Sequence, residues 1–202
     1  MGGTAETRSD GPQMSLAQWA ELPEDEPGEL VDDRIEEEEM ASAIHELIVG
    51  FLVAAFRVWA VPRGGFVFGS EIKLGVAPRR GRKGDLVVYL PGQRKPSARA
   101  SMTRVPPGIV VEVVSPTPRD GRRDRVEKSD EYAAFGVRFY WIVDPELRTL
   151  EIHELGPDGR YTRALGATAG LLDRVPGCEG LVLDLDSMWT EVDRLLAEGD
   201  TE

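Results

Sequence analysis

One acidic residue, Glu112, interrupts a run of valine and isoleucine over residues 109–114. Such an apolar run is typical of a strand that is buried on both faces of a sheet. Because an unpaired carboxylate is costly to bury, an acid there needs a salt bridge, a metal ion or a shifted pKa. A place at the end of the strand with a salt-bridge partner would explain Glu112 without any chemistry, so this alternative stands beside a catalytic one.

A second acid, Asp85, opens the preceding apolar segment, which reads D-L-V-V-Y-L. If the two strands are neighbours in one sheet, Asp85 and Glu112 converge at the same end of that sheet. Two carboxylates, together with carbonyl and water oxygens, suit Mg²⁺ or Mn²⁺ rather than zinc. A divalent ion there would offset the charge of Glu112 and activate water for hydrolysis of a phosphodiester.

A lysine would complete such a site by orienting water or by offsetting charge on the phosphorane. Lys128 is the candidate because it lies on the helix predicted directly after the Glu112 strand. Tyr132 follows four residues later and would share its helix face. The alternative for Lys128 is an ordinary surface ion pair, with Glu127 or Glu131 as its partner.

The rest of the sequence divides into helices and strands by its apolar periodicity and its turn residues. Residues 41–60 form the clearest helix, with apolar residues at three- and four-residue spacing. A charged segment over 120–135 is the second long helix and ends at Gly136. The other predicted elements are a helix over 15–21 with Ser15 as N-cap, a hairpin over 29–35, strands over 66–68, 71–76, 85–90, 109–114 and 139–143, a hairpin of 150–155 with 161–164, and a helix over 187–197 capped by Ser187.

The order of these elements predicts an α/β domain with a mixed central sheet flanked by helices. Strand, helix and strand across residues 109–143 indicate a right-handed crossover between parallel strands. A further hairpin and helix follow at the C-terminus. We expect one domain over residues 14–198, after a polar, disordered tail over 1–13. The single cysteine, Cys178, excludes an internal disulfide framework and a cysteine-rich zinc site.

The sequence predicts a cytoplasmic protein without membrane contact. Residues 1–10 are polar and lack the apolar core of a signal peptide. The longest apolar stretch, over 47–61, is interrupted by Arg57 and is shorter than a membrane-spanning helix.

The net charge of −12 is unevenly distributed along the chain. Residues 79–104 hold eight Lys and Arg residues against Asp85 alone, whereas both ends of the chain are strongly acidic. Because local charge decides what a surface attracts, this stretch could bind DNA phosphates, although a solvated loop would explain it equally well. The candidate phosphate-binding residues are Arg79, Arg80, Arg82 and Lys83, with Arg119 and Arg122 at the start of the second long helix.

Several segments together resemble the Uma-type restriction-endonuclease family, which belongs to the PD-(D/E)XK nuclease superfamily. They are G-E-L-V-D-D-R-I, His45 in the first long helix, Asp85 at a strand start, and V-V-E-V-V-S-P with E-K-S-D-E-Y-A-A-F-G-V and Y-W-I-V-D-P. The resemblance covers residues 15–190, and its specific part is 109–145. It implies a restriction-endonuclease-like core and a metal-dependent endonuclease that hydrolyses DNA.

By this resemblance, Asp85 and Glu112 bind Mg²⁺ or Mn²⁺, and Lys128 assists the attacking water. Ser115 matches a serine that follows the strand in the family and could help to orient the site. His45 matches a histidine of the first long helix, where related nucleases often carry an extra acid near the metal.

The sequence also departs from the family. Val114 occupies the position, two residues after the glutamate, where the superfamily usually has its lysine, so the mechanism depends on Lys128. Gly84 replaces the proline of the P-D signature, and E-E-E-E-M-A-S-A-I replaces a serine- and proline-rich loop before His45. These departures and the acidic ends leave a non-catalytic nuclease-fold module, for binding or dimerisation, as the alternative function.

Two further predictions concern assembly and other enzyme classes. We predict a homodimer. Trp189 and the amphipathic last helix could form its interface, but a role in capping the core is the favoured interpretation of that helix. A small-molecule hydrolase has no support because the sequence contains no G-x-S-x-G motif. His153 alternates within a strand pattern, as a structural histidine would.

Overall fold

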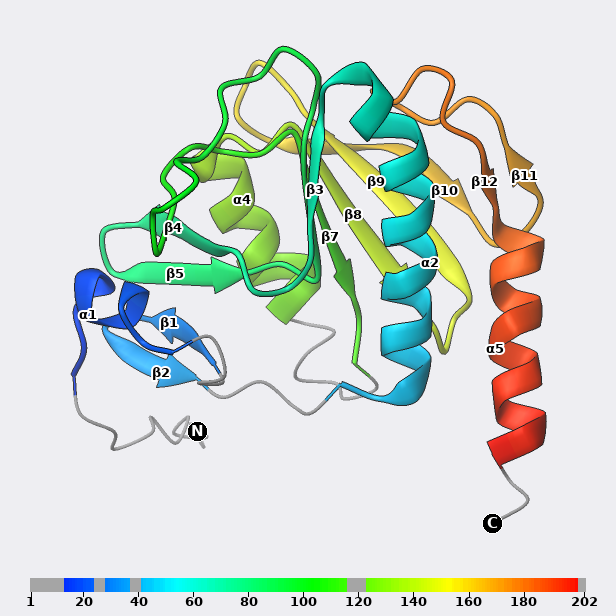
Figure 1. Ribbon diagram of the computed structural model, residues 1–202, viewed down its shortest axis with the longest axis horizontal. Coiled ribbons are helices and arrows are strands. Elements are labelled where there is room, and N and C mark those ends of the chain that lie inside the picture. The colour runs from blue at the N-terminus through cyan, green and yellow to red at the C-terminus, as the bar shows by residue number, and fades with distance from the viewer. Residues whose placement is uncertain (1–12, 24–27, 37–40, 116–122, 200–202) are drawn as a thin grey trace, which may run out of the picture.

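A six-stranded mixed sheet is the centre of the computed structural model, which describes residues 13–23, 28–36, 41–115 and 123–199 (Figure 1). Its strand order is β10-β9-β8-β7-β6-β3. The strands are β3 (Phe66–Phe68), β6 (Leu86–Tyr89), β7 (Ile109–Val113), β8 (Phe139–Asp144), β9 (Thr149–Leu155) and β10 (Tyr161–Ala167). Strands β7 and β8 are parallel, and the other neighbouring pairs are antiparallel. The predicted α/β fold with a mixed central sheet is confirmed.

Helices cover both faces of this sheet (Figure 1). The helical elements of the structure are α1 (Leu16–Ala20), which packs on the second sheet described below, α2 (Ala43–Ala60), the short 3-10 helix η1 (Val61–Arg63), the π-helical turn η2 (Arg123–Lys128), α4 (Ser129–Phe135) and α5 (Leu185–Gly199). Helices α2 and α5 pack on each other and on one face, while α4 packs on the other face. The predicted hairpin of β9 with β10 and the C-terminal helix are both present.

Alternation along β7 determines which face each of its side chains occupies. Val111 and Val113 belong to the apolar core that contains α2 and α5. Val110 and Val114 belong to a second apolar core, which contains Tyr132 of α4. Glu112 shares the face of Val110 and Val114, so its carboxylate is directed to the side of the sheet on which α4 packs.

A second sheet, with the strand order β2-β1-β5-β4, joins the N-terminal segment to the centre of the chain. Its strands are β1 (Glu29–Val31), β2 (Arg34–Glu36), β4 (Lys73–Ala77) and β5 (Arg80–Lys83). Trp19 of α1 packs on Gly81 of β5, where an added Cβ would lie 2.2 Å from the indole ring. The predicted hairpin over 29–35 is confirmed, but residues 80–83, which we expected in a basic loop, form a strand of this sheet. A third, two-stranded sheet pairs β11 (Leu171–Leu172) with β12 (Leu183–Asp184).

Together, α2 and η1 form a helical segment that is longer than the apolar stretch over residues 47–61. The segment Ala43–Arg63 is long and apolar enough to cross a membrane, judged by length and composition alone. Core helices of soluble proteins meet the same criterion, and α2 buries one face, with Ile48, Leu52 and Phe56, in the core against the central sheet.

Two helix caps test the sequence analysis. Ser15 caps α1 as predicted, and its hydroxyl and Gln18 form a reciprocal capping box. The predicted cap of the last helix is wrong, because α5 starts at Leu185 and Asp184 accepts hydrogen bonds from both the amide and the hydroxyl of Ser187. An aspartate suits this position as well as a serine does.

Trp189 on α5 is buried, and its indole donates to the carbonyl oxygen of Thr168 at 2.9 Å. The last helix therefore caps the core, which was the alternative to a dimer interface. The tail predicted for 1–13 and the start of the helix predicted from 120 lie mostly outside the described residues, and the single domain over 14–198 stays a prediction.

Candidate active site

Glu112 is held by two side chains from the helical segment that follows its strand. Its side chain is 3% exposed. Lys128 Nζ donates to Glu112 Oε2 at 2.9 Å, and the Tyr132 hydroxyl donates to Oε1 at 2.7 Å. The surface ion pair considered for Lys128 is wrong, because this side chain is 2% exposed. The structure thus brings Lys128 and Tyr132 to Glu112, and their catalytic roles stay predictions.

Asp85 lies at the same end of the sheet as Glu112, because it immediately precedes β6 and that strand runs antiparallel to β7. Its Oδ2 accepts a hydrogen bond from the backbone N–H of Val113 at 2.6 Å and lies 3.2 Å from His45 Nε2. Ser42 caps α2 and so places His45 in the first turn of that helix. Burial lowers the pKa of His45, but its contacts with Asp85 and Glu46 together outweigh this effect and raise the pKa above its ordinary value.

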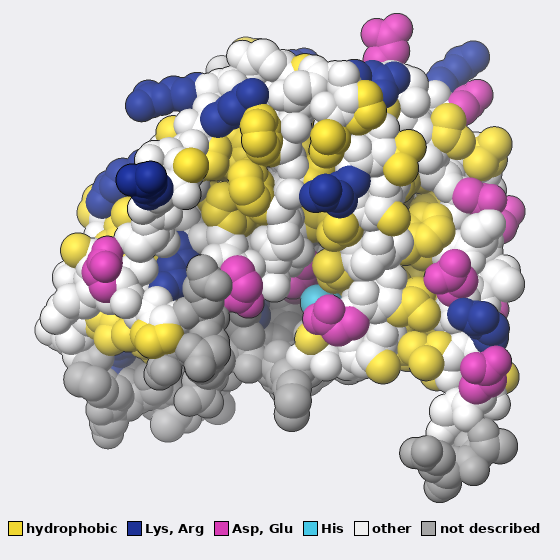
Figure 2. Space-filling model, viewed as in Figure 1, with side chains coloured by type: hydrophobic (Ala, Val, Ile, Leu, Met, Phe, Trp, Pro, Cys, Tyr) yellow, Lys and Arg dark blue, Asp and Glu magenta, His cyan; other side chains and the backbone are white. Residues whose placement is uncertain are grey.

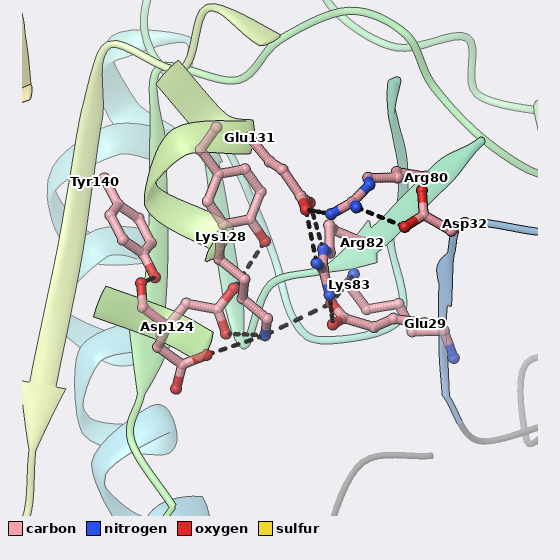
Figure 3. Close-up of polar contacts among 11 residues, drawn as sticks. Glu29, Asp32, Arg80, Arg82, Lys83, Asp124, Lys128, Glu131 and Tyr140 are labelled. Carbon is pink, nitrogen blue, oxygen red and sulfur yellow. Dashed lines mark hydrogen bonds and ion pairs between the residues drawn. The ribbon is translucent and has the colours of Figure 1, made fainter. Parts of the chain in front are cut away.

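The ammonium group of Lys128 lies among three carboxylates from different parts of the chain (Figure 3). Its Nζ is 2.9 Å from Glu112 Oε2, 3.5 Å from Asp124 Oδ1 and 3.6 Å from Glu29 Oε1. A lysine ammonium has three N–H donors and accepts no hydrogen bond. We call Lys128, Glu112, Asp124 and Asp85 the lysine cluster.

Two acids of the lysine cluster, Glu112 and Asp124, have raised pKa values. Burial raises the pKa of Glu112 well above its ordinary value; Lys128 opposes this, and repulsion from Asp85, Asp124 and Glu29 adds to it. Burial likewise raises the pKa of Asp124, and Asp85 and Glu29 raise it further against the attraction of Lys128. The cluster therefore holds more negative charge than its lysine offsets.

A second buried group of charges lies beside the first and shares Glu29 with it (Figure 3). Arg82 is 0% exposed, and its guanidinium donates to Glu29 Oε2 at 2.7 Å and to the two Glu131 oxygens at 2.6 and 2.9 Å. Arg80 pairs with Glu131 and, at 2.9 Å, with Asp32. We call Arg82, Arg80, Glu29 and Glu131 the arginine cluster, and it connects β1, β5 and α4.

The pKa of Glu29 is lowered by cations of both clusters. Burial raises it, but the charges of Lys128, Arg82 and Arg123 and a hydrogen bond from the Lys83 amide lower it to about 2. Glu29 therefore stays ionised at neutral pH, between the two clusters.

Residues 79–104 do not form one basic loop, because residues 80–83 form β5, and phosphate binding by this stretch stays a prediction. Arg82 has no exposed surface, and Arg80 is paired with acids in the arginine cluster. Arg79 pairs with Asp33, and the largely buried Lys83 contacts Glu71 at 3.2 Å. Their cationic groups serve intramolecular ion pairs in the described structure. Arg119 and Arg122 lie outside the described residues.

The rest of the basic stretch lies at the other end of the central sheet from the site. It connects the end of β6 to the start of β7, whereas Asp85 precedes β6 and Glu112 lies near the end of β7. Figure 2 shows Lys and Arg side chains gathered along the upper left, where Figure 1 places this connection, and Asp and Glu side chains along α5. The basic residues of this connection are Arg94, Lys95, Arg99 and Arg104.

Sequence reasoning missed Glu29 and Asp124. Asp124 lies four residues before Lys128, a spacing that places both on one helix face, so the sequence contained the signal. Glu29 belongs to the segment that resembles the Uma-type family, but nothing local indicates a partner 99 residues away. Only the pairing of β1 with β5 brings it to the site.

The structure also gives the positions of Gly84, Val114, Ser115 and His153. A Cβ added to Gly84 would lie 2.7 Å from Val110 Cγ1, so glycine lets β7 approach closely where the family has proline. Val114 is buried in the apolar core beside α4, which confirms that it contributes no polar group. Ser115 follows β7, and its role stays a prediction. His153 lies on β9, 3.5 Å from Glu151.

The donor chemistry of the lysine cluster fits a hard divalent cation. Asp85, Glu112 and Asp124 supply carboxylate oxygens, which are the ligands that Mg²⁺ and Mn²⁺ prefer. One of those oxygens, Asp124 Oδ1, is buried without a hydrogen bond. Over the described parts of the chain, no three His, Cys, Asp or Glu side chains are already arranged as a metal cage.

Comparison with known proteins decides the family. The profile described as "Uma2: Putative restriction endonuclease" matches residues 15–186. The chain belongs to the Uma2 family. Among curated proteins none matches it. The Uma2 fold is also found in a solved structure from Anabaena variabilis, described as "a putative nuclease belonging to DUF820", with a TM-score of 0.68 and 17% identity over 88% of this chain and 98% of the other.

This membership confirms the resemblance on which the sequence analysis relied, and it supports the nuclease class. The similarity to the Anabaena structure, at 17% identity, shows the fold alone. In this Uma2 protein, the segments that carried the resemblance place Asp85, Glu112 and Lys128 at one end of the sheet.

Proposed function

We propose that this protein is a divalent-metal-dependent endonuclease that hydrolyses phosphodiester bonds of DNA. The observation that carries the proposal is the buried contact of Lys128 with Glu112, at the end of the sheet that also holds Asp85. Two acids can hold a divalent ion and a lysine can orient water, a combination suited to metal-assisted phosphodiester hydrolysis. Membership of the Uma2 family supports a nucleic acid as the substrate.

Asp85 and Glu112 would hold the cation, Mg²⁺ or Mn²⁺. When bound, that ion supplies Lewis acidity and positive charge at the scissile phosphate. The chain keeps both acids in place, because the Val113 amide and His45 hold Asp85, while Tyr132 holds Glu112.

Lys128 acts as a hydrogen-bond donor in this proposal. Because it is an ammonium among carboxylates, it can align the attacking water or stabilise charge on the phosphate, and it is not placed to accept a proton. Its burial keeps competing water away and strengthens these electrostatic effects.

DNA cleavage by the full chain in Mg²⁺ or Mn²⁺ tests the proposal. Asp85→Asn, Glu112→Gln and Lys128→Met are each expected to reduce cleavage by about 10²-fold or more, the usual cost of losing one electrostatic stabiliser. Asp130→Asn is the matched control, because this acid is exposed on α4 near Lys128. A wild-type protein that neither binds these cations nor cleaves linear, nicked or supercoiled DNA would rule the proposal out.

A non-catalytic nuclease-fold module is the second candidate. It is favoured by one observation: both oxygens of Glu112 already accept hydrogen bonds from within the protein, from Lys128 and Tyr132. Cation binding without cleavage of any DNA or RNA would support this candidate over the first.

The homodimer and the cytoplasmic location remain proposals. Because Trp189 is used within the core, a dimer would need a surface other than the one formed by this residue. Light scattering of the full chain across a concentration series would show whether a dimer forms.

A further inference from the structure

Asp124 has a carboxylate oxygen that the fold leaves without a hydrogen bond. Its side chain is 6% exposed, and Oδ1 has no hydrogen-bond partner. The nearest cation, Lys128 Nζ, is 3.5 Å away, which is an ion-pair distance beyond that of a good N–H···O bond. Buried polar atoms are nearly always hydrogen-bonded, so this oxygen requires a reason.

A structural role does not supply that reason. The neighbouring structural acids, Glu29 and Glu131, accept short hydrogen bonds from Arg82 or from a backbone amide. Asp124 contributes to the packing through its backbone instead, since its carbonyl oxygen accepts the Tyr140 hydroxyl at 2.9 Å. The fold is therefore anchored at Asp124 while the carboxylate oxygen keeps its capacity for a ligand.

The segment that carries Asp124 is fixed in place on both sides. It belongs to the π-helical turn η2, a form that often occurs at functional sites. Arg125 of the same turn donates to Glu151 at 2.6 Å and to Asp144 at 2.9 Å, which ties η2 to β9 and β8. Lys128 ends the turn and ties it to Glu112 of β7. The unpartnered oxygen thus lies in a rigid setting beside the proposed catalytic acids.

From this geometry we infer that Asp124 is a third carboxylate ligand of the divalent cation that Asp85 and Glu112 would hold. The inference rests on the proposed function and goes beyond it, because neither the family motif nor the pair of strand-borne acids assigns this residue. Oxygen-only ligation is what Mg²⁺ and Mn²⁺ prefer. A cation beside Asp124 would also offset the repulsion among the acids of the lysine cluster, and its binding would exchange the loose Asp124–Lys128 ion pair for a direct bond.

Mn²⁺ binding to the full chain, measured by calorimetry and by electron paramagnetic resonance of the free ion, tests this assignment without relying on cleavage. The comparison uses wild-type protein, Asp124→Asn and the control Asp130→Asn, which removes an exposed acid from the next helical turn. We expect wild type and Asp130→Asn to bind alike. Asp124→Asn should bind about tenfold or more weakly, because even partners of metal ligands contribute that much.

The outcomes separate this inference from the proposed function. If wild type binds no Mn²⁺, the proposed function fails and this inference fails with it. If wild type and a folded Asp124→Asn bind Mn²⁺ equally, the inference alone is overturned and Asp85 with Glu112 remains. Should Asp124→Asn prove misfolded by circular dichroism, anomalous density in Mn²⁺-soaked wild-type crystals decides. A peak within bonding distance of Asp124 Oδ1 supports the assignment, and a peak bonded only to the other acids overturns it.

Discussion

The lysine cluster and the arginine cluster are both largely buried, combine cations with carboxylates and meet at Glu29 (Figure 3). One acid in each, Glu112 and Glu29, nevertheless has its pKa shifted in the opposite direction. In the arginine cluster the pKa of Glu29 falls to about 2. In the lysine cluster the pKa of Glu112 rises well above its ordinary value. Burial opposes ionisation in both places, and Lys128 lowers both pKa values, so the difference comes from the other neighbouring charges. Arg82 and Arg123 lower the pKa of Glu29 further, whereas Asp85, Asp124 and Glu29 raise that of Glu112.

A guanidinium and an ammonium satisfy different numbers of acids in different ways. The planar fork of Arg82 gives parallel hydrogen bonds to Glu131 and a further one to Glu29. Lys128 is a compact point charge among three carboxylates, and only Glu112 receives a short bond. The arginine cluster is thus a satisfied support for β1, β5 and α4, whereas the lysine cluster retains the negative charge that a metal-dependent site needs.

The largest effect on stability is expected from breaking the arginine cluster. Arg82→Met leaves the buried Glu29 and the largely buried Glu131 without the guanidinium that bonds both, and should lower the free energy of unfolding by about 3–5 kcal/mol. Arg148→Met is the control, because Arg148 pairs with Asp193 on the surface, where a pair contributes about 0–1 kcal/mol. Urea unfolding of both variants measures the contrast, and similar losses would contradict the distinction between the clusters.

Acid should weaken the protein through the same cluster. Because the folded pKa of Glu29 lies below its ordinary value of 4.5, its contribution is fully present above pH 4.5 and is lost as the pH falls towards about 2. The contribution is on the order of 3 kcal/mol. Urea unfolding of wild type and Glu29→Gln between pH 7 and pH 2.5 should show their difference shrinking below pH 4.5. A difference that stays constant over this range would count against a depressed pKa.

The smallest of these three effects on stability comes from Glu112, whose ionised form destabilises the folded protein. Because the folded pKa of Glu112 is raised, the unfolded chain releases this proton first as the pH rises, and ionised Glu112 costs stability above pH 4.5. Without divalent cations, Glu112→Gln should therefore stabilise the protein at pH 7 by about 1 kcal/mol, which is about 2–4 °C in Tm for a domain of this size. Thermal unfolding in EDTA measures this gain, which should vanish below pH 4.5. A loss of stability at pH 7 would show that Lys128 fully offsets the acid.

The elements that carry the lysine cluster could be predicted because their signals are local. An apolar run predicted β7 and showed Glu112 as the one acidic residue within it. Lys128 follows in the next helical segment, a short distance along the chain. Asp85 opened a second apolar run, and the antiparallel pairing of β6 with β7 places both acids at one end of the sheet. The same local signals could have indicated Asp124, four residues before Lys128.

The basic stretch over residues 79–104 shows what local sequence does not predict, namely the burial of a charged side chain. Its residues were counted correctly as cations, but charge in sequence does not show whether a side chain faces solvent or a buried acid. Arg82 is enclosed because β5 pairs with β1 and brings Glu29 against it, while α4 brings Glu131 from the other side. Both partners lie about fifty residues away along the chain.

The sequence by itself determined the kind of fold, the family and the two acids with their lysine, since strand alternation, helix spacing and short motifs are written in neighbouring residues. Tertiary structure alone decided which acids are satisfied and which are not. That distinction depends on burial and on partners brought together by strand pairing, and these set the opposite pKa shifts of Glu29 and Glu112.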